Sequence, residues 1–218
     1  MRGVSTANVG YKLFAAAALC SCAGFAQQFE IGGAIGYGAY RNGTVFGPGS
    51  SAQAGIRNRF AAGAVIGEDL YQHFSGEVRY LYKDGHAFVS SGSARTEMQA
   101  ESHTLTYEFL YHPLRRESRV RPFLAAGVGG KDYMASGPAP FFQPTAALAA
   151  LVPRDQWQFV SVFGGGVKIR VANRVLVRGD FRDYLTAFPK RQIVPLGKNT
   201  ARGIFQQFTP LFGVSYCF

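Results

Sequence analysis

The chain has 218 residues, enough for one domain, and its 23 basic and 13 acidic residues give a formal net charge of +10 at pH 7. Its hydrophobic fraction of 47% is that of an ordinary folded protein, while 27 glycines and 19 phenylalanines favour strands joined by glycine-rich turns. No basic run is longer than two residues and no nucleic-acid-binding motif is present, so the positive charge does not indicate a nucleic-acid partner.

The N-terminus has the pattern of an export signal. Arg2 and Lys12 precede a short apolar run from Leu13 to Phe25, and the small residues that end at Ala26 predict cleavage by a signal peptidase after Ala26. The apolar run is shorter than the ~20 residues that a membrane-spanning helix needs. We therefore expect residues 1–26 to be a signal peptide and residues 27–218 to be the mature domain.

The cysteines allow one alternative for the leader. Residues 19–22 weakly resemble a lipobox, so lipid attachment at Cys22 is an alternative to simple cleavage. Cleavage after Ala26 leaves Cys217 as the last of the three cysteines. We therefore expect no intramolecular disulfide in the mature domain, although it is exported.

Eight stretches of the mature chain alternate apolar and polar residues with the period of two that is typical of β-strands. The first stretch places Phe29, Ile31 and Ile35 on one face, with Glu30 and small residues on the other. In chain order the predicted strands are residues 29–40, about 54–66, 73–83, 101–112, 120–131, 157–171, 175–185 and 203–218.

The last predicted strand has two unlike faces. Its large apolar face carries Phe208, Pro210, Phe212, Val214, Tyr216 and Phe218, and its small or polar face carries Thr209, Leu211, Gly213, Ser215 and Cys217. A soluble protein seldom ends with an aromatic strand that faces water. The apolar face is therefore expected to lie in a core or to face lipid.

The lengths of the connections alternate between roughly ten to twenty-five residues and roughly three to seven, as in outer-membrane barrels, whose loops are long outside and short in the periplasm. We therefore predict an all-β fold: an eight-stranded antiparallel up-and-down transmembrane β-barrel whose last strand pairs with the first. The segment 84–99 is expected to be a polar loop. In the longest connection, the apolar run 145–152 is expected to form two helical turns over the barrel mouth.

Charged residues recur on the strand faces opposite the aromatic ones. An eight-stranded barrel has an interior just wide enough for side chains, so inward charges must pair with one another. A soluble barrel would instead place its charges outside. We expect a lumen charge network formed by Glu30, Glu77, Arg79, Lys83, Glu108, Lys168, Arg178, Asp180 and Arg182. A gated ion path is the alternative interpretation for six of them: Glu77, Arg79, Glu108, Arg178, Asp180 and Arg182. Aromatic residues expected at the membrane interfaces are Tyr37, Tyr82, Tyr111 and Trp157.

Together these features resemble the small eight-stranded outer-membrane β-barrel family, like the membrane domain of outer-membrane protein A. The resemblance covers about Gln27 to Phe218 and rests on the leader, on the segments 119–131 and 163–185, and on the terminal SYCF. It implies an outer-membrane location in contact with membrane lipid. Biogenesis would involve periplasmic chaperones and the barrel assembly machinery, which reads an aromatic signal here formed by Phe212, Val214, Tyr216 and Phe218.

The resemblance also has a limit. No peptidoglycan-binding domain follows Phe218, so we do not expect this chain to tether the cell wall. We expect a monomer. We read Arg178 and Asp180, which flank Gly179, as two inward charges and not as an adhesion motif.

Two sets of residues have the types found in catalytic or metal sites. His73, Ser75 and Glu77 could form a Ser–His–acid hydrolase, but they adjoin a predicted periplasmic turn and their spacing alone is weak support. The remaining histidines lack the spacing of metal ligands and are expected at surfaces or interfaces: His86, His103 and His112.

The sequence thus predicts a non-enzymatic barrel, without cofactor or metal, that has a structural or surface-interaction role through its outer loops. Two alternatives stay open. One is a narrow pore for ions or small solutes, and the other is a barrel enzyme that modifies lipids of the outer leaflet.

Overall fold

The computed structural model describes residues 29–202 and 204–218. The predicted signal peptide, its cleavage after Ala26 and the alternative lipidation at Cys22 lie outside the described residues. Within the described ranges, no helix is long and apolar enough to cross a membrane.

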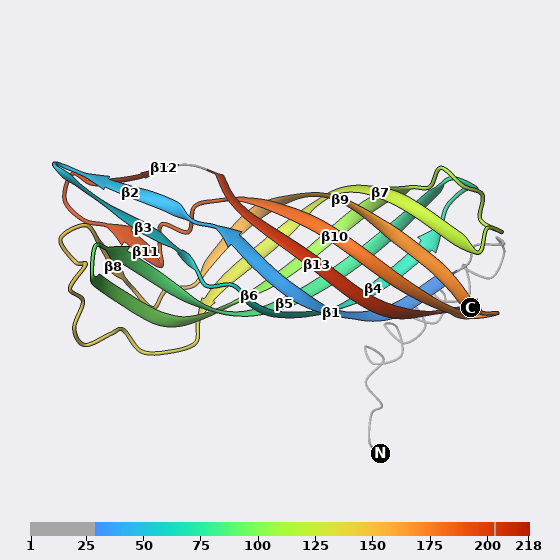
Figure 1. Ribbon diagram of the computed structural model, residues 1–218, viewed down its shortest axis with the longest axis horizontal. Helices are drawn as coiled ribbons and strands as arrows, with labels where there is room; N and C mark the ends of the chain where they lie inside the picture. The colour runs from blue at the N-terminus through green and yellow to red at the C-terminus, as the bar shows by residue number, and fades with distance from the viewer. Residues whose placement is uncertain (1–28, 203) are drawn as a thin grey trace, which may run out of the picture.

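Eight long strands close into an antiparallel barrel, which Figure 1 shows as a cylinder whose strands are tilted to its axis. They are β1 (Phe29–Arg41), β4 (Arg59–Asp69), β5 (Phe74–Ser91), β6 (Ala94–Tyr111), β7 (Val120–Ala135), β9 (Gln156–Ala172), β10 (Val175–Ala187) and β13 (Ile204–Cys217). Each strand pairs with its neighbours in chain order, and β13 pairs with β1 through contacts such as Ile35 opposite Phe212. The predicted eight-stranded up-and-down barrel is confirmed, and so is its closure by the first and last strands.

Five short strands extend one end of the barrel (Figure 1): β2 (Gly43–Gly47), β3 (Ser50–Ile56), β8 (Ala149–Leu151), β11 (Ile193–Pro195) and β12 (Thr200–Arg202). β2 pairs with β3 and β12, β3 also pairs with β5, and β8 pairs with β11. The opposite end carries the C-terminus and the connections 70–73, 112–119 and 173–174. Because barrels of this type have short turns in the periplasm, the extended end is the extracellular one.

The second predicted strand, 54–66, is in fact two strands that pair with different partners. β3 ends at Ile56 beside β5, whereas β4 begins at Arg59 beside β1. The ladder breaks between them because the Asn58 side chain accepts the backbone N–H of Tyr40 at 2.8 Å and so replaces a strand partner. The connection between the first two predicted strands is not a loop, since it forms β2 and the start of β3.

The predicted polar loop 84–99 is wrong, because β5 and β6 continue beyond the barrel as one hairpin. Its inward positions stay apolar, with Ala87, Val89 and Met98 buried, so the strand pattern persists. Gly92 has a φ of 57° in the two-residue turn, a left-handed conformation that glycine adopts without steric cost.

The predicted helix at 145–152 is also wrong. The segment makes a single turn, in which the N–H groups of Leu148 and Ala149 bond to the Thr145 carbonyl, and then enters β8. The side chain of Gln143 bonds both backbone groups of Leu151 and holds this strand instead of a helix. A run this short has little helical stability of its own. The segment nevertheless packs over the barrel mouth, as expected, because Leu148 and Leu151 are buried in the extracellular core.

The outer surface of the barrel is apolar on all eight strands. Leu105 is 56% exposed and Phe163 is 52% exposed, and similar outward side chains follow each strand. Such a continuous apolar exterior is far larger than the patches that soluble monomers expose. Because closure pairs every barrel strand on both edges, the backbone satisfies its own hydrogen bonds as a membrane requires. The barrel therefore spans a membrane.

Candidate functional site in the barrel lumen

The periplasmic half of the lumen holds a buried network of four acids and four bases. Its residues point inward from five strands: Glu30 on β1, Glu77 and Arg79 on β5, Glu108 on β6, Lys168 on β9, and Arg178, Asp180 and Arg182 on β10. Because the acids and bases are equal in number, the formal charge of this cluster, which we call the ion network, is zero.

Arg178 lies at the centre of the ion network. Its guanidinium contacts Glu30 at 3.1 Å, Glu77 at 2.8 Å and Asp180 at 3.0 Å. Arg79 joins the same Glu77 at 2.6 Å and the same Asp180 at 2.7 Å. Each acid is thus shared between bases, which offsets the cost of removing these charges from water.

A second part of the network is the pair of Arg182 and Glu108, which longer contacts join to the rest: Arg79 lies 3.5 Å from Glu108, and Arg182 lies 4.0 Å from Glu77. The Nε of Arg182 donates to Glu108 Oε2 at 2.7 Å, and both side chains are completely buried. The Phe123 ring lies 5.2 Å from the Arg182 guanidinium, a cation–π distance. Gly164 leaves room for this arginine, because an added Cβ would lie 2.1 Å from the Phe181 carbonyl oxygen and 2.9 Å from Arg182 Cδ.

An apolar layer follows the ion network along the lumen. Its buried members pack together from six strands: Ala34, Ala61, Leu81, Val160, Val162, Tyr184 and Leu211. On β5 the inward order from the periplasmic end is Glu77, Arg79, Leu81 and Lys83, so the apolar layer separates the ion network from what lies above it. Water and ions would have to cross this apolar layer to pass through the barrel.

Lys83 lies above the apolar layer, apart from the ion network to which the sequence assigned it. Its Nζ is 3.6 Å from the centre of the Tyr40 ring and donates to the Arg57 carbonyl at 3.2 Å. Lys131 approaches the same tyrosine from β7, bonding its hydroxyl at 3.0 Å and the Gln207 side chain. The expectation for Lys83 was wrong because Leu81, one inward position earlier, belongs to the separating layer.

The extracellular end of the lumen is closed by a hydrophobic core. Its residues come from the barrel strands and from every short extension strand: Tyr40, Val45, Ala52, Ala54, Ile56, Ala87, Val89, Met98, Ala100, Tyr133, Leu148, Ala149, Leu151, Phe188, Ile193, Ala201 and Phe205. We call this part the extracellular module. Its apolar core makes it an ordered unit instead of a set of loose loops.

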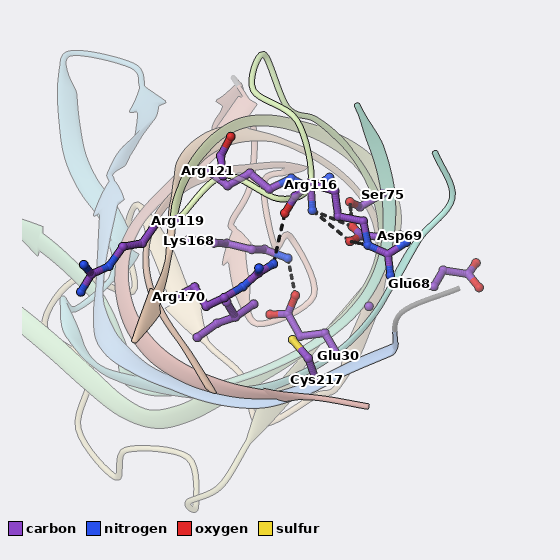
Figure 2. A pocket seen from close by; sticks show the side chains of 13 residues that line it. Glu30, Glu68, Asp69, Ser75, Arg116, Arg119, Arg121, Lys168, Arg170 and Cys217 are labelled. Atoms are coloured by element: carbon purple, nitrogen blue, oxygen red, sulfur yellow. Dashed lines mark hydrogen bonds and ion pairs between the residues drawn. The ribbon is translucent and has the colours of Figure 1, made fainter. Parts of the chain in front are cut away.

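The periplasmic mouth of the lumen contains a small polar cavity, which Figure 2 shows from close by. Arg121 donates to both carboxylate oxygens of Asp69, at 2.8 and 3.0 Å, while the Ser75 hydroxyl donates to the same acid at 2.6 Å. The side chain of Arg170 points into the mouth beside Lys168.

His112 lies buried just beyond the end of β6, which corrects its expected place at a surface. Its Nε2 is 3.0 Å from the Ser75 hydroxyl oxygen. Burial, together with the positive charges of Arg121 and Lys168, lowers the pKa of His112 to about 3. The residue is therefore neutral at physiological pH. His86 and His103 are only partly buried.

The candidate hydrolase residues are not assembled as a catalytic relay. His73 contacts the backbone carbonyl of His112 at 2.8 Å, Ser75 bonds Asp69 and His112, and Glu77 belongs to the ion network. In a relay the histidine bridges the serine and the acid. Here Ser75 instead lies between His112 and Asp69. Within the described residues, no group of three or more metal-ligand side chains occurs.

Three lumen residues escaped the sequence reasoning, although a signal for them existed. Arg121 and Lys131 share the alternation of Phe123 along β7, which marks both as inward. Asp69 ends β4 on its inward face. Arg121 and Lys131 lie near the ends of the predicted strand 120–131, and Asp69 follows the predicted strand 54–66, where a charged residue is common.

The four residues of the proposed assembly signal all lie on the outer face of β13. Phe212 is 59% exposed, Val214 is 50% exposed, Tyr216 is 39% exposed and Phe218 is 68% exposed. They extend the apolar belt to the periplasmic rim. Arg178 and Asp180, by contrast, are buried inside, so the Arg-Gly-Asp tripeptide is not available at the surface.

The closed eight-stranded barrel, its apolar outer belt and its polar filled lumen define a class: the small transmembrane β-barrels of the outer membrane. The fold is similar to that of neisserial surface protein A, with a TM-score of 0.50 and 13% identity over 88% of this chain and 97% of that one.

Two further solved structures are similar at lower scores. The outer-membrane protein AlkL has a TM-score of 0.49 and 16% identity, over 87% of this chain and 90% of that one. The N-terminal barrel domain of Pseudomonas aeruginosa OprF has a TM-score of 0.44 and 14% identity, over 88% and 97%. No protein-family model matches the sequence, and no curated protein matches it either.

Proposed function

We propose that the protein is a non-enzymatic outer-membrane barrel with a structural or surface-interaction role. The observation that carries this proposal is the filled lumen, in which the ion network, the apolar layer and the extracellular core follow one another. A barrel filled in this way provides a rigid base for the module that it presents outside.

The extracellular module supports the interaction role. A hydrophobic core holds its strands in place, while the segment between β7 and β8 displays two aromatic residues, Phe141 at 108% and Phe142 at 77% exposure. Ordered scaffolds with exposed aromatic side chains are suited to binding, because such side chains bury much area at low entropic cost.

Conductance measurements separate this proposal from a narrow pore. In planar lipid bilayers, we expect the protein to give no resolved current steps, because the apolar layer leaves no hydrated path. Replacing Leu81 and Leu211 together by serine should introduce water into that layer and raise the current above that of the wild type. Regular current steps from the wild-type protein would overturn the proposal.

Lipid analysis distinguishes the proposed non-enzymatic barrel from a barrel enzyme. After incubation of the purified protein in outer-membrane lipid vesicles, mass spectrometry should find lipid A and phospholipids unchanged. Release of an acyl chain that depends on Ser75 would instead support an enzyme at the periplasmic mouth.

Biogenesis completes the proposal. We propose that Phe212, Val214, Tyr216 and Phe218 act as the address read by the barrel assembly machinery, after periplasmic chaperones deliver the chain as a monomer. Their common outward orientation leaves them accessible to a partner before lipid covers them.

A further inference from the structure

The periplasmic mouth of the lumen holds more positive than negative charge. Four cationic side chains meet there: Arg116, Arg121, Lys168 and Arg170. Only two carboxylates point in among them, Glu30 and Asp69 (Figure 2). Arg119 and Glu68 also border the cavity, but Figure 2 shows their side chains turned away from it.

Both inward carboxylates are already engaged by several partners. Asp69 contacts Arg121 at 2.8 Å and Arg116 at 3.4 Å, and it accepts the Ser75 hydroxyl. Glu30 is shared between Lys168 and the more deeply buried Arg178. Even with Arg116 left aside, the cations Arg121, Lys168 and Arg170 outnumber the two inward carboxylates by one.

Two arginines have unused hydrogen-bonding capacity at this place. Arg170 donates to the Arg116 carbonyl at 3.1 Å, and within the described residues no carboxylate lies at ion-pair distance from it. Arg121 as a whole is only 7% exposed. Its buried Nε has no hydrogen-bond partner in the described part of the chain. A buried charged donor without a partner is costly, so a ligand that accepts hydrogen bonds is favoured here.

The size of the cavity limits the ligand. Its volume is about 30 Å³, above the roughly 10–15 Å³ that a site needs to hold one water-sized species. We propose that the mouth binds a single small inorganic anion of the size of chloride, held by Arg170 with Lys168 and Arg121. A phosphate or sulfate ion exceeds this volume, so we expect it to bind more weakly than chloride.

Chloride NMR tests the proposal directly on the refolded protein in an uncharged detergent. With gluconate as the balancing anion, ionic strength stays constant while chloride varies, so general screening does not change. The folded wild-type barrel should broaden the ³⁵Cl line in a saturable way. Arg170→Gln should reduce this excess broadening at least fivefold. The matched control Arg119→Gln borders the same cavity but points away, and it should leave the broadening unchanged.

A second measurement does not depend on any variant. The urea midpoint of the wild-type barrel should be higher in chloride than in gluconate at equal ionic strength, because a ligand of the folded state stabilises it. Equal midpoints in the two salts, or equal ³⁵Cl broadening by wild type and Arg170→Gln, would overturn the proposal. Displacement of the bound chloride by an equal concentration of phosphate would also overturn it, since the cavity would then accept larger anions.

Discussion

At the scale of the residue, the lumen is governed by the cost of burying charge. Arg182 and Glu108 are both fully buried and pair at 2.7 Å, and Arg79 is a more distant second partner of Glu108 at 3.5 Å. A buried ion pair contributes little net stability, but removing one partner leaves an uncompensated charge. A substitution at one of these two positions is therefore tolerated only when the other position changes with it.

The first prediction concerns this pair. Arg182→Met should destabilise the barrel by about 3 kcal/mol, because Glu108 then loses its 2.7 Å partner and keeps only Arg79 at 3.5 Å and the Thr106 hydroxyl at 2.9 Å. The double variant Arg182→Met/Glu108→Leu should recover most of that loss. Urea unfolding in detergent micelles, followed on gels, measures both effects.

The control for this prediction lies at the surface. Arg95 pairs with Glu97 at 2.5 Å, but both side chains are largely accessible to solvent. Arg95→Gln should therefore change stability by no more than about 1 kcal/mol. If the buried and exposed variants lost equal stability, the ion network would have no special role.

The second prediction concerns pH. The pKa of His112 is about 3 in the folded protein, against about 6.5 when unfolded. Protons therefore bind the unfolded chain first, so this residue contributes stability above pH 6.5 that is lost as the pH falls from 6.5 towards 3. His112→Gln should show a smaller loss of urea midpoint than the wild type between pH 7 and pH 4. Parallel pH curves for the two proteins would contradict a buried neutral histidine.

At the scale of the element, the strands could be predicted wherever one face meets lipid. The outward apolar and inward polar alternation of β9, β10 and β13 is readable in the sequence, and their bounds lie close to those expected. Prediction failed outside the membrane, where β5 and β6 continue with a buried apolar face. The failure arose because polar residues on the solvent side of these strands give the segment the composition of a loop.

The third prediction tests the last strand as an address. Phe218→Ala should lower the amount of barrel in the outer membrane of living cells, while the refolded variant stays folded in detergent. The residue is 68% exposed at the end of the apolar belt, so its loss costs little packing. Phe163→Ala on β9, equally lipid-facing, is the matched control and should insert normally. Normal insertion of Phe218→Ala would refute the signal.

The fourth prediction tests the register of the same strand. Cys217 faces the lumen and is 8% exposed, beside a cavity too small for a bulky reagent. A large maleimide should therefore label the folded protein slowly and the unfolded protein quickly. Glu117→Cys in a Cys217→Ser background places a thiol on the exposed periplasmic connection and should label quickly in both states. Fast labelling of Cys217 in the folded barrel would contradict the register.

At the scale of the whole molecule, the sequence predicted the barrel but not which inward side chains contact one another. Inward charges could be found by alternation, because Glu77, Arg79 and Arg178 each alternate with large apolar residues on their strand. Which charges meet depends on strand stagger and on packing across the lumen, and neither leaves a mark in one sequence. Lys83 shows this, since it has the same alternation as the ion network and lies beyond the apolar layer.

The central claim is a closed barrel that spans the outer membrane, and cell fractionation combined with gel mobility tests it most directly. Expressed in a Gram-negative host, the protein should be recovered in the detergent-extracted outer-membrane fraction. Without heating it should migrate faster than after boiling, because a closed barrel resists unfolding in detergent. Recovery in the soluble periplasmic fraction, or identical mobility with and without boiling, would contradict the account.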